Sequence, residues 1–408
     1  MLNYLWGGFF LVGAAVALAR FIAGDAGVFQ DLVNASFDSA KLAAQIAFGL
    51  VGVLALWTGL FRIAEQAGLI AVLGRWLSPV FERLMPDVPK GHPAQGAVTL
   101  NLAANMLGLD NAATPLGLKA MQELQSLNPS KDTASNAQIL FLVLNTSSVT
   151  LLPVTIFLYR AQLGSSDPTL VFIPILLATV ASTLAGLIAV MLVQRIRLDG
   201  ILLAWFGVFF LLLGSFIYWL TLLPATRLSD VSGILANGTL VAVITGFIAV
   251  GLWRRVPVYE EFIVGAREGF TTAVGLIPYL VAMLVAIGVF RASGALDYLG
   301  QGMKHLCQLA GWDARFVDAL PVALMKPFSG SGARAMMLDV MHSHGVDSFA
   351  GRLAAVMQGS TETTFYVLTV YFGVVGITRV RHALWCGLLA DFVGLATAVL
   401  VSYWFFGG

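Results

Sequence analysis

The chain has 408 residues, of which 58 % are hydrophobic and 11 % charged, and its formal net charge is +1. Roughly 25 % of the residues of an ordinary soluble domain are charged, so this composition excludes a surface that faces water on all sides. The small net charge excludes a field that attracts nucleic acid, and we expect no nucleic-acid partner. The lipid bilayer is therefore the expected solvent for most of the chain.

Long apolar runs predict the membrane-spanning helices, at about 20 residues per crossing. Ordinary spans, each treated as an apolar run without a lone charge in its middle, are expected at residues 4–24, 42–61, 136–159, 171–193, 200–223, 234–252, 270–290 and 381–404. A ninth run, residues 349–373, is long enough to cross but has a polar interior. No basic segment precedes the first run, so we expect an uncleaved helix rather than a signal peptide.

Two stretches, residues 68–130 and 294–347, are interrupted by Pro, Gly and polar side chains. Irregular backbone at membrane depth is tolerated only where protein or trapped water satisfies its N–H and C=O groups. We therefore expect each stretch to form one re-entrant hairpin of broken helices.

The two halves of the chain repeat each other around these stretches. Lys41 and Gly68 align with Arg267 and Gly294, and the polar segments that follow each hairpin align as well. Arginines in the loops near residues 195–197, 254–267 and 379–381 are placed in the cytoplasm by the positive-inside rule, which orients the two halves oppositely. The predicted fold is an all-α polytopic membrane protein with two inverted-topology repeats. The predicted domains are residues 1–197, a linking helix and loop at 198–232, and residues 233–408.

The first polar cluster lies in the hairpin of the first half. Asn101 and Asn105 are four residues apart and share a helical face, and Gly108 is expected to end that helix. Asp110 or Asn111 would cap the next helix, whose first turn tolerates Pro115, and Thr114 belongs to the same polar cluster. Free N–H groups at such a break suit an anion or a polar ligand, while the alternative is that these amides only hold helices together.

The second cluster is the corresponding segment Lys326–Arg334, which contains Ser329 and Ser331 between two cationic side chains. Its glycines allow a ligand to approach the backbone, so this segment is the best candidate for an anion-binding element. In the alternative interpretation, Lys326 and Arg334 extend to lipid headgroups as interfacial anchors.

The third cluster lies inside the polar ninth run. Gln358, Thr361 and Glu362 have the spacing of one helical face, and Asn145 and Ser148 occupy the matching place in the first half. A carboxylate at the centre of a span is costly, so Glu362 should either pair with Lys326 or Arg334 or hold a proton. A static structural ion pair is the alternative to a coupling role.

Catalytic and metal-binding motifs are not expected to contribute. His342 and His344 are predicted to lie in a solvated loop, and Cys307 and Cys386 lack a Cys-x-x-Cys spacing. No Ser-His-Asp order, H-E-x-x-H or G-x-S-x-G motif is present, so we expect no metal, no cofactor and no enzyme.

Several long segments resemble known proteins. Asn105–Leu124 and Leu144–Thr150 resemble spore maturation protein A. The segments that resemble spore maturation protein B are Pro257–Phe262, Ile277–Met283, Lys326–Arg334 and Gln358–Tyr366. The chain thus looks like a fusion of the two, joined near residues 198–232. This resemblance places the chain in the nucleoside-recognition or Gate superfamily, which includes concentrative nucleoside transporters and the membrane part of bacterial ferrous-iron transporters. It implies an inner-membrane protein of transporter-like fold.

The leading hypothesis is a secondary transporter for a small polar solute, anionic or zwitterionic, bound at the midplane between the two repeats. The predicted binding residues are Asn101, Asn105, Asn111, Thr114, Asn145, Ser148, Lys326, Ser329, Ser331, Arg334, Gln358, Thr361 and Glu362. The expected partners are the solute, a coupling ion (H+ or Na+), the lipid bilayer and further copies in a homo-oligomer. Two alternatives stay open: a structural or regulatory envelope protein that moves nothing, and an intramembrane enzyme with Glu362 as acid or base.

Overall fold

The computed structural model describes residues 2–107, 110–196 and 198–407, without the side chains of residues 2, 3, 5, 110–112, 225, 226 and 229. These residues are almost entirely helical, and their only strand-like pairing is an isolated bridge between Thr133 and Arg379. The predicted all-α class is therefore confirmed.

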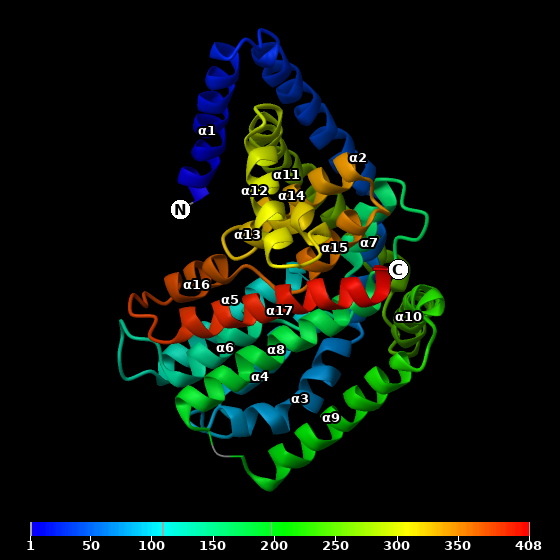
Figure 1. The fold of residues 1–408 in the computed structure, drawn as a ribbon. Coiled ribbons are helices and arrows are strands. Elements are labelled where there is room, and N and C mark those ends of the chain that lie inside the picture. The colour runs from blue at the N-terminus through cyan, green and yellow to red at the C-terminus, as the bar shows by residue number, and fades with distance from the viewer. Residues whose placement is uncertain (1, 108–109, 197, 408) are drawn as a thin grey trace. The chain divides into compact units, whose positions relative to one another are not determined.

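The helices follow one another along the chain as labelled in Figure 1. Those of the first half are α1 (Leu2–Ile22), α2 (Val28–Gln66), α3 (Leu69–Leu84), α4 (Pro93–Met106), α5 (Asp110–Leu127), α6 (Asn136–Thr146), α7 (Val154–Gln162) and α8 (Phe172–Gln194). Next come α9 (Gly200–Thr221), α10 (Ala225–Trp253), α11 (Val258–Ala292) and α12 (Ala295–Leu309). The rest are the 3-10 helix η1 (Arg315–Ala319), α13 (Leu320–Met325), α14 (Gly330–His344), α15 (Phe349–Gly359), α16 (Thr364–Gly373) and α17 (Ala383–Phe406).

Six of the described helices are long and apolar enough to cross a membrane: α2, α8, α9, most of α10, α11 and α17. The chain is therefore a multi-pass membrane protein. These helices overlap six of the predicted ordinary spans: 42–61, 171–193, 200–223, 234–252, 270–290 and 381–404. Two segments that were predicted to cross as single continuous helices are each divided into two helices, so these two predictions are wrong. Residues 136–159 divide into α6 and α7, because Pro153 has no N–H to donate and its ring clashes with the preceding turn. Residues 349–373 divide into α15 and α16 around the polar segment 360–363.

The two interrupted stretches form the expected broken helices. Residues 68–130 contain α3 and the hairpin of α4 and α5, and residues 294–347 contain α12, η1 and the hairpin of α13 and α14. Gly68 and Gly294 begin α3 and α12 with φ of 75° and 87°, a left-handed conformation that glycine adopts without a steric penalty. The inverted relation of the two halves stays a prediction.

The chain forms two compact units, and each draws on both halves of the sequence. Unit 1 contains residues 1–62, 155–168 and 259–358, and unit 2 contains residues 63–154, 169–258 and 359–408. The predicted domains were defined by repetition in the sequence and not by contacts between residues, so these two units do not test them. The domains stay a prediction.

Unit 2 is built around α6. Every residue of α6 from Ala137 to Thr146 is buried, as expected for a helix that is surrounded by other helices. Helices α8, α16 and α17, together with the hairpin of α4 and α5, pack against it. Helix α9 is different, because it buries only Leu202 and Leu220 and presents its other apolar side chains outward, as a lipid-facing helix does.

Candidate functional site

The C-terminal end of α6 carries the first group of predicted site residues. Ser135 begins this helix with a capping box, and the end of the helix buries Asn145 and Thr146. Asn145 Oδ1 accepts hydrogen bonds from Asn105 Nδ2 at 2.7 Å and from the Tyr371 hydroxyl at 3.3 Å. Helices α4, α6 and α16 therefore meet at one amide, so residues from both sequence halves share this part of the site.

Asn101 connects the two arms of the first hairpin. Its Nδ2 donates to the Ala113 carbonyl oxygen at 2.7 Å, whereas its buried Oδ1 has no hydrogen-bond partner. Gly117 on α5 has no side chain, and a Cβ there would lie 2.2 Å from the Tyr371 hydroxyl oxygen. The hairpin therefore packs closely on α16 while one amide oxygen remains available to a ligand or a water molecule.

The break between α15 and α16 contacts the end of α6. Thr361 Oγ1 lies 2.9 Å from the Thr146 carbonyl oxygen, and the same oxygen accepts the Glu362 N–H at 2.7 Å. Asp391 Oδ1 lies 2.6 Å from Thr361 Oγ1, and its Oδ2 lies 2.6 Å from Thr364 Oγ1. Two interrupted helices and the middle of α17 thus share one buried cluster of oxygen atoms.

Asp391 is the residue that sequence reasoning missed. The prediction that residues 381–404 carry no lone charge in their middle is wrong, because Asp391 lies within them and is only 1 % exposed. The available signal was a single ionisable residue within a membrane span, which marks a functional site by default. Gly387 and Gly394 flank it on α17 and allow neighbouring segments to approach.

The predicted helical face shared by Gln358, Thr361 and Glu362 is also wrong. Helix α15 ends at Gly359, so helical spacing does not continue into the residues that follow. Gln358 lies in unit 1, whereas Thr361 and Glu362 lie in unit 2. Glu362 is exposed and forms no ion pair among the described residues of unit 2. Its predicted coupling role stays a prediction.

The remaining predicted residues of the first half differ in burial, and two of them are not fully described by the structure. Ser148 is 7 % exposed and follows the end of α6. Thr114 is exposed on α5. The side chain of Asn111 and the residue Gly108 lie outside the described part of the structure.

The second polar cluster lies in unit 1. Lys326 is 2 % exposed, and its Nζ donates to the Gln358 carbonyl oxygen at 2.8 Å, at the C-terminal end of α15. A cation at this end of a helix is stabilised by the helix dipole. Lys326 is therefore buried rather than extended to a headgroup.

The other members of this cluster also have neighbours inside unit 1. Ser329 caps α14 by accepting the Gly332 N–H at 3.0 Å, and its Oγ lies 3.2 Å from that of Ser331. The Arg334 guanidinium lies 5.6 Å from the ring centroid of Tyr159, a cation-π distance. Cations and hydroxyls are gathered at the start of α14, and their predicted binding of an anion stays a prediction.

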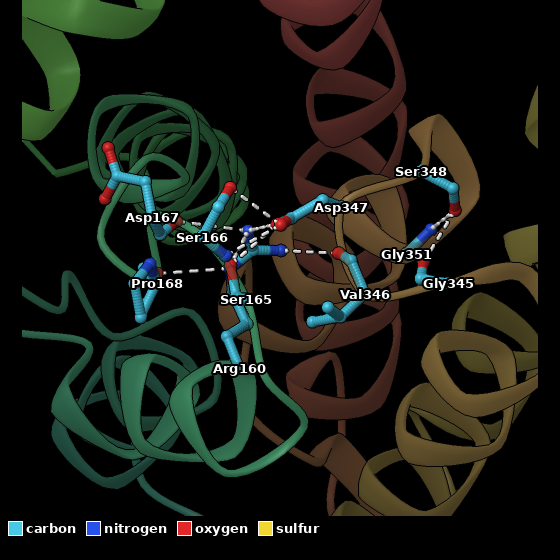
Figure 2. Close-up of polar contacts among 10 residues, drawn as sticks. All are labelled: Arg160, Ser165, Ser166, Asp167, Pro168, Gly345, Val346, Asp347, Ser348 and Gly351. Atoms are coloured by element: carbon cyan, nitrogen blue, oxygen red, sulfur yellow. Dashed lines mark hydrogen bonds and ion pairs between the residues drawn. The ribbon is translucent and has the colours of Figure 1, made fainter.

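Figure 2 shows a further polar cluster of unit 1, in which Arg160 at the end of α7 joins two connecting loops. Arg160 is fully buried, and its Nη2 donates to Asp347 Oδ1 at 2.8 Å. Its guanidinium also donates to Ser165 Oγ and to the carbonyl oxygens of Asp167, Pro168 and Val346. All of its nitrogen atoms have acceptors, so we interpret this cluster as structural.

The same cluster predicts the acid stability of the protein. Partial burial alone raises the pKa of Asp347, but hydrogen bonds from Ser165 and Ser166 and the charge of Arg160 outweigh it, and the pKa falls to about 2. A carboxylate with a lowered pKa stabilises the folded state above its ordinary pKa near 4, and this contribution is lost as the pH falls towards 2. We expect Asp347→Asn to be less stable than the wild type at pH 7 and similar to it at pH 2, as measured by thermal unfolding. Equal destabilisation at both pH values would contradict this assignment.

Metal binding has no support among the described residues, which contain no group of three or more His, Cys, Asp or Glu side chains suited to a metal ion. The loop predicted for His342 and His344 is wrong, because both residues lie in the last turn of α14. That helix continues to Gly345, whose φ of 94° ends it.

One cavity of unit 2 lies away from the predicted site residues. It has a volume of about 360 Å³ and lies at the N-terminal end of α6, opposite the end that carries Asn145. Its lining includes Asp87, Asn128, Ser135 and Arg381.

Comparison with known proteins identifies the family. The model of the family described as "Gate: Nucleoside recognition" matches residues 47–163 and 273–378, which is more than half of the chain. The chain belongs to the Gate family. Each matched stretch of this Gate-family chain begins within a long helix and then contains one hairpin and one broken helix. Asp391 lies outside both matched stretches.

Two relatives of this Gate-family chain come from Bacillus subtilis (strain 168). The chain is 48 % identical to spore maturation protein B over 165 residues, which are 40 % of this chain and 91 % of that protein. It is 42 % identical to spore maturation protein A over 188 residues, which are 46 % of this chain and 93 % of that protein. The resemblance to both is confirmed and is consistent with a fusion. No solved structure matches the chain.

Proposed function

We propose that this chain is a secondary transporter of the bacterial inner membrane that carries a small polar solute, anionic or zwitterionic. The observation that supports the proposal is the meeting of two helix breaks and a hairpin inside unit 2. Asn105 and Asn145 come from the first half of the sequence, and Thr361, Tyr371 and Asp391 come from the second. Sites of this kind, built from discontinuous helices, bind substrates and coupling ions in secondary transporters.

Buried polar atoms without partners support a ligand at this place. Asn101 Oδ1 and Thr146 Oγ1 are buried and have no hydrogen-bond partner. Each such group costs about 1–3 kcal/mol, and a hydrogen bond to a solute or to water would offset that cost. The asparagine and tyrosine side chains around them bring both donors and acceptors, which suits a solute that carries both kinds of group.

The other parts of the proposal follow from the same interpretation. We propose that the chain is not an enzyme and that H+ or Na+ is the coupling ion. We also propose that the chain forms a homo-oligomer in the lipid bilayer and binds no nucleic acid. A nucleoside is one solute to test, because the matched family is described by nucleoside recognition.

Uptake into proteoliposomes tests the proposal. A thermal-stability screen of the purified chain against small metabolites first selects solutes that bind the folded form and so raise its melting temperature. We expect Asn145→Ala to reduce uptake of a selected solute at least tenfold, because it removes the acceptor shared by Asn105 and Tyr371. Asn34→Ala is the matched control, since Asn34 is an exposed residue of α2.

Two further variants test the predicted charged residues. Glu362→Gln and Lys326→Met should each reduce uptake if these residues belong to the site. If both variants fold and keep full uptake, Glu362 and Lys326 do not belong to the binding site.

The names of the two relatives favour a second candidate, a structural or regulatory role in envelope maturation. If this second candidate is correct, solutes that raise the melting temperature of the wild type are not taken up into proteoliposomes. Such a result in correctly reconstituted vesicles would replace the transporter proposal.

A further inference from the structure

Asp391 is a buried carboxylic acid whose hydrogen-bond geometry reports its protonation. It lies in the middle of α17, is 1 % exposed, and each of its oxygen atoms lies 2.6 Å from a threonine hydroxyl. Thr361 is near Oδ1, and Thr364 is near Oδ2. Neither threonine side chain can donate more than one hydrogen atom.

Counting hydrogen atoms at Thr361 distinguishes the two states of the acid. Thr361 Oγ1 lies 2.6 Å from Asp391 Oδ1 and 2.9 Å from the Thr146 carbonyl oxygen. A carboxylate and a carbonyl are both acceptors, so one hydroxyl hydrogen cannot serve both contacts. If Asp391 is ionised, one of these short oxygen-oxygen contacts has no hydrogen atom. If Asp391 Oδ1 carries a proton, that proton is donated to Thr361, Thr361 donates to Thr146, and Thr364 donates to Oδ2. Each of these three contacts then has its own hydrogen atom, and the Glu362 carbonyl oxygen lies farther from Thr361 Oγ1, at 3.4 Å.

The titratable and charged groups near Asp391 lie on few of the elements that pack against α17. Helices α6 and α8, which pack against α17, carry no titratable side chain. The titratable and charged groups on α17 itself and on the other segments that pack against it are Arg227, Asp230, Glu362, Tyr366, Tyr371, His382, Cys386 and Tyr403. Of these, Arg227, Asp230, Glu362 and Tyr366 are exposed, and Tyr371 is bonded to Asn145.

We propose that Asp391 is a proton-binding site, and that its proton holds the α15–α16 break against the end of α6. On ionisation the O–H bond of the carboxylic acid breaks, its electron pair stays on Oδ1, and the proton passes to water. The Thr361 hydroxyl then turns to Asp391, and the Thr146 carbonyl loses one of its two donors. A coupling role of Asp391 in transport rests on the proposed function. The binding of a proton by Asp391 does not depend on that function.

Infrared difference spectroscopy of the full chain in lipid nanodiscs tests the proposal. At pH 7 the wild type should show the C=O stretch of a protonated carboxylic acid, and Asp391→Asn should remove it. Asp38→Asn is the matched control and should leave the band unchanged, because Asp38 is exposed on α2. Thr364→Val should shift the band to higher frequency, since the carbonyl oxygen Oδ2 loses its hydrogen bond. This variant keeps the test informative if Asp391→Asn does not fold.

Thermal unfolding gives an independent measurement. The unfolded acid ionises near pH 4, so a proton retained by the folded state makes the wild type less stable as the pH rises. Relative to Asp391→Asn, the folding equilibrium constant of the wild type should fall up to tenfold per pH unit from about pH 5 upward, until the folded acid ionises.

Three results would overturn the proposal: no acid band at pH 7 in the wild type, a band that persists in Asp391→Asn, or a band that Thr364→Val leaves in place. A melting temperature that NaCl raises in the wild type but not in Asp391→Asn, relative to choline chloride, would reassign the site to Na+. The transporter proposal fails separately: an acid band without uptake rejects transport alone, and uptake without an acid band rejects the proton site alone.

Discussion

Replacing Arg160 with methionine is expected to lower the free energy of unfolding by about 3–5 kcal/mol. Methionine fills a similar volume but removes the guanidinium, whose nitrogen atoms lie within hydrogen-bond distance of five acceptor oxygens. The carboxylate of Asp347 then loses its charge partner, and three backbone carbonyl groups lose a donor. Lysine should rescue little of this loss, because an ammonium group cannot reproduce the planar fork of arginine. Denaturant-induced unfolding of the purified variants measures the effect.

Arg227→Met is the matched control for this variant. Arg227 is exposed near the start of α10, so the same substitution there should change stability by less than about 0.5 kcal/mol. Similar losses for the two variants would show that the Arg160 cluster is not the cause. A double variant with Asp347→Asn should lose less than the sum of the two single losses, since the two residues share one interaction.

Gly394→Leu is expected to destabilise the protein by about 3 kcal/mol, at the upper end of the range for overpacked cores. A Cβ at this position would lie 2.9 Å from the Cβ of Ser182 on α8 and 3.1 Å from the carbonyl oxygen of Ser360. One of these atoms belongs to the backbone of the α15–α16 break, which a side-chain rotation cannot move. We therefore expect the variant to separate α17 from its neighbours, reducing thermal stability and any solute uptake together.

Gly207→Leu provides the comparison. Gly207 lies on the outward-facing helix α9, and a Cβ there meets nothing within 4 Å, so leucine should be accepted without loss. If both leucine variants melt at the wild-type temperature, the close packing of α8 and α17 does not limit stability. Small residues at such interfaces let helix backbones approach closely, and the resulting van der Waals contacts contribute to helix association in a bilayer.

The sequence predicted the fold best where the chain is uniformly apolar. The runs at 171–193 and 200–223 became α8 and α9 within two residues at each end, because length and hydrophobicity alone decide whether a segment can cross a bilayer. Prediction failed where polarity interrupts an apolar run. Residues 136–159 are apolar enough to cross, yet Pro153 and the polar end of α6 divide them. Mean hydropathy averages over such a break and hides it.

Sequence reasoning named some residues of the candidate site in unit 2 and missed one of its buried residues. Asn105 and Asn145 were both identified by their polarity, and the structure brings them to 2.7 Å. Asp391 was missed because the apolar residues around it dominate the run that contains it. The expected helical face at Thr361 was wrong because it assumed a continuous helix through the residues where the chain unwinds.

The shared core of unit 2 has a consequence for biosynthesis. Helix α8 buries much of one side against α17, which the ribosome produces roughly 200 residues later. At an elongation rate of about 5–20 residues per second, α8 and the carbonyl end of α6 are in the membrane for about 10–40 s before α17 has been synthesised. During that delay an insertion chaperone or lipid must cover them. A nascent chain truncated before residue 359 should consequently be a preferred target for membrane proteases.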